Sequence, residues 1–136
     1  MSISLTHYAY KVNQLQRHEA EAAKASGINL FQLMARAGAA VLSQIQQHFP
    51  AARHLHIICG KGNNGGDGYV IAKIAHEVGL SVTVLVMAER EAITGDAQQA
   101  LILLEALPVK INFYQQSELK VASIAAFQAD IIVDCL

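Results

Sequence analysis

The sequence is poor in charge and in cysteine, and it has no apolar stretch long enough to cross a membrane. Only 15% of the residues are charged, the net charge is −1, and lysine and arginine are dispersed along the chain. This dispersal argues against a nucleic-acid-binding protein, which would carry a basic patch. The N-terminal segment lacks the basic and apolar regions of a secretory signal, so we expect a soluble, cytoplasmic protein.

The few cysteines and histidines favour no metal or disulfide site. Cys59 and Cys135 do not form a Cys-x-x-Cys pair, and each lies in an apolar run typical of a buried strand. In a reducing compartment, buried thiols need neither a disulfide nor zinc. His54 and His56 point to one face of a predicted strand, but no third ligand follows at a recognisable spacing. We therefore expect ordinary packing or exposure at a sheet edge for this pair.

The N-terminal part of the chain is predicted to be helical. A polar, alanine-rich helix over Val12–Ser26 ends at Gly27, where a helix C-terminal glycine is common. A second helix, capped by Asn29, carries an apolar stripe at helical spacing and runs to Pro50. We interpret this stripe as a core-facing surface.

From His54 onward, short apolar runs alternate with amphipathic ones, a pattern typical of βαβ units and a parallel sheet. The predicted strands are His54–Cys59, Ser81–Met87, Val109–Tyr114 and Asp130–Cys135. The predicted helices are Gly66–Val78, Gly95–Leu107 and Ser117–Gln128, with Thr94 and Ser117 as caps. Right-handed crossovers then give one α/β domain over residues 1–136. It is a Rossmann-like twisted parallel sheet with helices on both faces, a three-layer αβα architecture preceded by a two-helix arm.

A glycine-rich loop follows the first predicted strand, at the sheet edge where parallel sheets bind ligands. Residues 60–68 read GKGNNGGDG, with five glycines among nine residues. The glycines are expected to let the backbone approach a ligand and adopt positive φ, and the following helix N-terminus favours a phosphate. Lys61 adds a mobile positive charge. Asn63, Asn64 and Asp67 add amide and carboxylate groups for a sugar hydroxyl, an amide or a hard cation.

Two other interpretations of the loop remain open from the residues alone. No Gly-Lys-Ser/Thr closes it, which excludes a P-loop kinase or ATPase. However, Gly60, Gly62 and Gly65 form a G-x-G-x-x-G pattern, and Glu89 follows at the distance expected of an ordinary Rossmann cofactor site. A tight strand-to-helix turn with Asp67 as a helix cap is the other alternative.

The full string GKGNNGGDGYVIA resembles the signature of the NAD(P)H-hydrate epimerase family, also called the YjeF N-terminal domain family. The strings LMARAG at residues 33–38 and IVDCL at 132–136 are similar to further family motifs and flank the signature in the family order. The resemblance covers nearly the whole chain as the front part of the family domain. It implies an isomerase that interconverts the R and S epimers of NADHX and NADPHX, the hydrated forms of NADH and NADPH, in nicotinamide nucleotide repair.

The resemblance also implies which residues form the site. Asn63, Asn64, Gly65, Gly66 and Asp67 match the family's substrate-binding loop, and Asn64 matches a ligand of a potassium ion. Asp134 matches a second potassium ligand and ends the fourth predicted strand at the same sheet edge as the loop. A solvent-exposed strand-end acid is the alternative interpretation of Asp134.

Partners and catalysis follow from the resemblance as well. It implies a homodimer and an ADP- or ATP-dependent NAD(P)H-hydrate dehydratase, fused or separate, that consumes the S epimer. In the family, a second glycine loop, the remaining potassium ligand and an acid–base aspartate follow the segment that matches Leu136. Because this C-terminal part is absent, the catalytic residue is unknown. The alternative function is a non-catalytic dinucleotide-binding or protein-interaction module.

Overall fold

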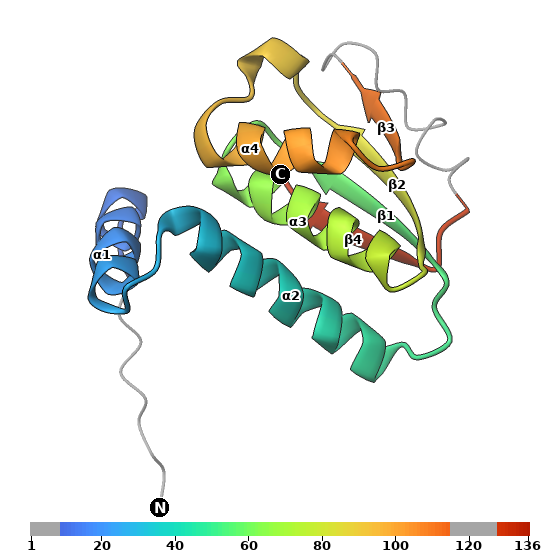
Figure 1. Cartoon of the computed structure of the whole chain (residues 1–136), viewed down its shortest axis with the longest axis horizontal. Coiled ribbons are helices and arrows are strands. Elements are labelled where there is room, and N and C mark those ends of the chain that lie inside the picture. Colours follow the sequence, from blue (N-terminus) through green and yellow to red (C-terminus); the bar gives the residue numbers. More distant parts are fainter. Residues whose placement is uncertain (1–8, 115–127) are drawn as a thin grey trace, which may run out of the picture.

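The structure, a computed structural model, describes residues 9–114 and 128–136 and is built on a four-stranded parallel sheet (Figure 1). The strands lie in the order β3-β2-β1-β4. Their bounds are β1 (His54–Cys59), β2 (Ser81–Val86), β3 (Lys110–Phe113) and β4 (Ile131–Cys135). The predicted parallel α/β sheet is confirmed, and β1 lies in its centre between β2 and β4.

The helices that join neighbouring strands lie on one face of the sheet. Helix α3 (Asn63–Glu77) connects β1 to β2, and α4 (Gly95–Glu105) connects β2 to β3 after the short 3₁₀ helix η1 (Arg90–Ala92). Because the chain moves in the same direction both times, right-handed crossovers place α3 and α4 side by side (Figure 1). The helix predicted at Ser117–Gln128, with its cap, falls outside the described residues except for Gln128.

Two N-terminal helices precede the sheet, as predicted. Helix α2 (Leu30–His48) packs along α3, whereas α1 (Val12–Ala25) contacts α2 and stands apart from the sheet (Figure 1). Asn29 caps α2 as expected, since its side chain accepts a hydrogen bond from the Gln32 backbone at 2.7 Å. Thr94 occupies the N-cap position of α4, but its side chain makes no capping hydrogen bond, so that part of the prediction is wrong. None of the described helices is long and apolar enough to cross a bilayer.

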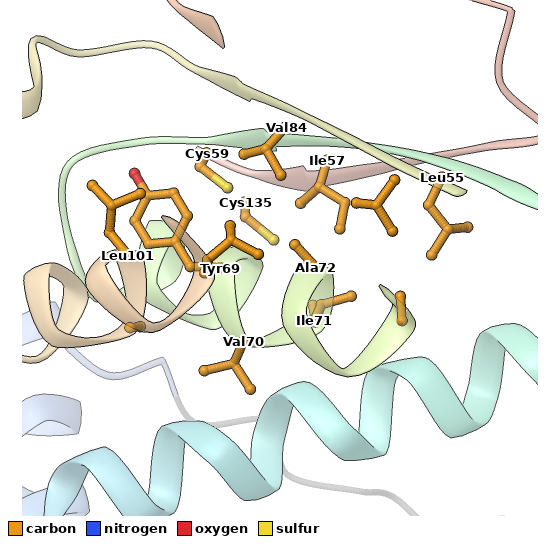
Figure 2. Packing of buried hydrophobic residues seen from close by; sticks show 14 of the residues in the cluster. Leu55, Ile57, Cys59, Tyr69, Val70, Ile71, Ala72, Val84, Leu101 and Cys135 are labelled. Atoms are coloured by element: carbon orange, nitrogen blue, oxygen red, sulfur yellow. The ribbon is translucent and has the colours of Figure 1, made fainter. Parts of the chain in front are cut away.

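The core lies between the sheet and α3. Side chains alternate along a strand, so Leu55, Ile57 and Cys59 of β1 all face α3, and all three are fully buried. Figure 2 shows these side chains above those of Tyr69 and Ala72 on α3. This packing determines the distance between α3 and the carboxyl end of β1.

Both cysteines are buried, as the sequence predicts. Cys59 and Cys135 are buried free thiols, and burial raises both pKa values, that of Cys135 to about 11. His54 and His56 lie on the other sheet face, where their rings meet edge to face at 4.7 Å. Throughout residues 9–114 and 128–136, no three His, Cys, Asp or Glu side chains are grouped to hold a metal ion.

Candidate functional site

The strand order reverses between β1 and β4. The chain runs from β1 through β2 to β3 in one direction and returns to β4 on the other side of β1. Open parallel sheets bind ligands at such a reversal, outside the carboxyl ends of the strands. The glycine-rich loop after β1 and Asp134 near the end of β4 flank this point.

The loop itself is shorter than the sequence predicts. Helix α3 begins at Asn63 rather than Gly66, because the Gly66 amide already donates to the Gly62 carbonyl at 3.0 Å. The loop is thus reduced to residues 60–62, and Gly62 occupies the N-cap without a side-chain cap. Asp67 lies inside the helix, so the interpretation of Asp67 as its cap is wrong.

Three glycines of α3 pack closely against their surroundings. A Cβ atom on Gly65 would lie 2.0 Å from the Gly60 carbonyl oxygen, and one on Gly68 would lie 2.5 Å from Cys59 Sγ. A Cβ atom on Gly66 would lie 2.6 Å from Met34 Cε of α2. The first two helix turns therefore pack closely against the loop, the sheet and α2 at once. Gly65 and Gly66, predicted to bind substrate, are buried.

The prediction of positive φ in this loop is wrong. Among the described residues, only Gly27, Gly79 and Gly95 have positive φ. Gly62 has a φ of −93° and open space around the position of a Cβ atom. Of the loop and helix glycines, Gly62 is therefore the one exposed to an incoming ligand.

Gly60 links three parts of the fold. Its amide donates to the Cys135 carbonyl of β4 at 2.9 Å, and its carbonyl accepts a hydrogen bond from the Tyr69 hydroxyl at 3.3 Å. Tyr69 is fully buried, and burial raises its pKa, so the prediction of a packing role is confirmed. These contacts fix the start of the loop against both α3 and β4.

Asn64 and Asp134 meet at one residue, Leu136. The Asn64 Nδ2 atom donates to the backbone oxygen of Leu136 at 2.8 Å. The Leu136 amide donates to Asp134 Oδ1 at 3.0 Å. The fold thus brings the two predicted metal ligands together, from the first turn of α3 and the end of β4, although 70 positions separate them in the sequence.

Asn63 and Asp67 lie on a different face of α3. They line a cavity of about 110 Å³ between α1, α2, α3 and α4. Its remaining lining residues are Glu19, Leu30, Leu33, Met34, Ala37 and Asp96. Burial, and then the charge of Glu19, raise the pKa of Asp67 to about 6. The predicted substrate-binding segment is therefore divided between two faces of one helix turn.

Sequence reasoning missed Glu19 and Asp96. Each occupies a position typical of a solvated helix residue, Glu19 in the middle of α1 and Asp96 in the first turn of α4. Only the packing of four helices brings them to the same cavity as Asp67. Glu89, the acid of the alternative Rossmann interpretation, is exposed before η1 and does not line this cavity.

A parallel sheet with a glycine-rich strand-to-helix turn at its point of reversal defines a Rossmann-like α/β protein. More narrowly, the sequence model of the family described as "YjeF-related protein N-terminus" matches residues 30–136, and the chain belongs to that family.

Curated relatives and a solved structure agree with this assignment. The bifunctional NAD(P)H-hydrate repair enzyme Nnr of Escherichia coli is 40% identical over 98 residues, which are 72% of this chain and 19% of the relative. Nnr of Coxiella burnetii is 38% identical over 93% of this chain and 24% of its own length. The NAD(P)H-hydrate epimerase of Rhodobacter capsulatus is 38% identical over 64% of this chain and 43% of its own.

The crystal structure of yeast YNL200c superposes with a TM-score of 0.71 at 25% identity, covering 95% of this chain and 56% of the yeast chain. The chain thus spans about a fifth to a quarter of the two bifunctional relatives and under half of the Rhodobacter epimerase.

The backbone contact between Gly65 and Gly60 predicts that Gly65→Ala destabilises the fold. A new Cβ atom would clash with the carbonyl of Gly60, a residue that hydrogen bonds to Cys135 and Tyr69 hold in place. We therefore expect a loss of about 1–3 kcal/mol in the free energy of unfolding. Gly62→Ala is the comparison variant, because a Cβ atom there meets open space. It should lose only about 0.5–1 kcal/mol, since alanine is a poorer N-cap than glycine. Urea denaturation measures both values. Equal stabilities of the two variants would contradict the assigned contact.

The raised pKa of Asp67 predicts a pH-dependent cost. Its folded value of about 6 exceeds the ordinary value of 3.8, so the folded state binds more protons between these values. The Asp67 contribution to stability should therefore fall as the pH rises from about 4 to about 6 and stay constant above that range. Asp67→Asn removes this loss. In denaturation experiments from pH 4 to 8, the free energy of unfolding of the variant relative to the wild type should increase only between about pH 4 and pH 6. A difference that is the same at every pH would refute the assignment.

Proposed function

We propose that this chain forms the substrate-binding front part of an NAD(P)H-hydrate epimerase, an isomerase that interconverts the R and S epimers of NADHX and NADPHX. Family membership and relatives named NAD(P)H-hydrate epimerase and NAD(P)H-hydrate repair enzyme support the proposal. The observation that carries it is the meeting of the loop, the first turn of α3 and the end of β4 around Leu136.

The N-terminus of α3 suits the diphosphate of a dinucleotide. The first-turn amides, at Asn63, Asn64 and Gly65, point out of the helix end and carry partial positive charge. No side chain caps them, and the open position at Gly62 lets an anion approach. Lys61, exposed in the loop, adds a full positive charge beside them.

Asn64 and Asp134 fit a potassium ion. Because the Asn64 amide nitrogen is engaged with Leu136, its oxygen Oδ1 is the atom left to coordinate a cation. The exposed Asp134 carboxylate adds hard oxygens on the other side of Leu136. We propose that these two residues hold the ion and that the chain's own atoms orient them through Leu136. A bound cation would supply positive charge next to the diphosphate.

The partners remain proposals of the same kind. Relatives named bifunctional repair enzymes support a dehydratase that works with the epimerase, fused or separate. The homodimer and the cytoplasmic location stay predictions of the resemblance. No residue of this chain is assigned the acid–base role, so its contribution is binding and orientation.

Turnover of a mixed sample tests the function. The full-length gene product and this chain are each incubated with R and S NADHX and a dehydratase specific for the S epimer. An epimerase lets the dehydratase consume both epimers faster than spontaneous epimerisation allows, as followed by chromatography. If the full-length protein binds NADHX but R-NADHX persists as in the enzyme-free control, the function is that of a binding module.

The proposed cation site predicts a preference for potassium over lithium. Binding to the folded state alone should raise stability by about 1.4 kcal/mol at ten times the dissociation constant. Thermal melts in matched potassium and lithium chloride should therefore differ for the wild type. Asp134→Ala also loses the hydrogen bond to Leu136, so the potassium-minus-lithium difference is compared within each protein. An equal difference in both proteins would remove Asp134 from the site.

A further inference from the structure

The cavity beside the glycine loop is strongly acidic. Three of its lining residues are carboxylates that come from three different helices, Glu19 of α1, Asp67 of α3 and Asp96 of α4. No lysine or arginine is among its lining residues. Burial, and then the charge of Glu19, raise the pKa of Asp67, which indicates that Glu19 and Asp67 interact across the cavity.

The position of Glu19 is built into the chain. Helix α1 ends in a Schellman motif, in which the Ile28 amide donates to Ala23 at 3.0 Å and the Gly27 amide to Lys24 at 3.1 Å. Gly27 adopts a φ of +68°, and Asn29 then caps α2 directly. This corner sets the angle between the two helices, and thereby places a negative charge near the N-termini of α3 and α4 (Figure 1).

The same helix turn has a second side, which does not line the cavity. Successive helix residues are rotated by about 100°, so Asn64 lies about 80° around the helix from the face shared by Asn63 and Asp67. Asn64 reaches the end of β4. The exposed loop that leads into this turn carries Lys61. Lys61 does not line the cavity. An anion at the N-terminus of α3 can thus lie either beside the carboxylates of the cavity or beside Asn64 and the end of β4.

We infer that Glu19, Asp67 and Asp96 form a repulsive wall that determines how the substrate is oriented, confining its diphosphate to the side of the α3 N-terminus where Lys61 and Asn64 lie outside the cavity. This inference rests on the proposed function, because it assigns the anionic part of the same dinucleotide to one side of the loop. The carboxylates do not bind the diphosphate. They raise the free energy of every pose that brings it into the cavity, which is a specificity element of the site.

The wall is tested by removing one carboxylate charge and measuring whether the affinity for an anion rises or falls. A partly exposed carboxylate within about 10 Å of an anion changes its affinity roughly two- to fivefold at low salt, and screening removes most of this effect at high salt. Glu19→Gln should therefore lower the Kd of ADP-ribose roughly two- to fivefold in low salt and much less in 0.5 M salt. Glu19 is exposed, so the substitution should leave the fold intact.

Calorimetry with ADP-ribose, which carries the diphosphate, and with adenosine, which lacks it, gives the readout. The matched control is Glu21→Gln, on the same helix but outside the cavity, where Glu21 pairs with Arg17. It should leave the Kd of ADP-ribose unchanged, and the Kd of adenosine should be equal in all proteins. Lys61→Gln should raise the Kd of ADP-ribose.

The outcomes separate the wall from the proposed function. If Glu19→Gln weakens ADP-ribose binding, the carboxylate is a ligand and the wall is refuted. The wall is also refuted if the two glutamate variants behave alike, or if the wild type does not bind ADP-ribose at all. If the charge effects appear as stated but the full-length protein fails to epimerise NADHX, the wall stands and the proposed function is wrong.

Discussion

The close contact of α3 with its surroundings is the constraint on which the site depends. The first two turns of this helix touch the Gly60 carbonyl, the sulfur of Cys59 and the flexible end of the Met34 side chain, and the backbone contact with Gly60 leaves no room for a Cβ atom on Gly65. Because α3 lies so close to the sheet, its N-terminus is placed at the carboxyl ends of β1 and β4. If the helix lay farther from the sheet, Asn64 could not donate its hydrogen bond to Leu136, and the first turn of α3 would lose its contact with the end of β4.

This constraint changes how the glycine-rich string is interpreted. In the sequence, five glycines among nine residues suggest a flexible loop that wraps a ligand. In the fold, most of the string is a tightly packed helix, and Gly62 alone lies in open space among its glycines. The pattern therefore preserves a rigid shape, and a ligand meets a preorganised helix end rather than a loop that must first order itself.

Periodicity predicted much of the fold, because the spacing of apolar residues within a segment indicates whether that segment is a strand or a helix. Strand β1 matches its predicted bounds, and the Asn29 cap is local. The start of α3 was predicted three residues too late, since glycine and asparagine have low helix propensity and tertiary packing overrides it here. The acidic cavity could not be predicted. Its carboxylates are far apart in the sequence, and none differs locally from a solvated helix residue.

The charges around the α3 N-terminus connect the proposed cation with the proposed acidic wall, because both would determine on which side of this helix end a diphosphate binds. Around this helix end, Lys61 is outnumbered by four carboxylates, three in the cavity and Asp134 beside Leu136. A diphosphate would enter a region of net negative charge, which the partial charge of a helix end does not neutralise. The cation that we propose at Asn64 and Asp134 would reverse the balance on one side only, and the proposed wall would keep the other side unfavourable. The diphosphate then has one favourable side, so we expect anion affinity and potassium concentration to be thermodynamically linked, each raising the apparent affinity for the other.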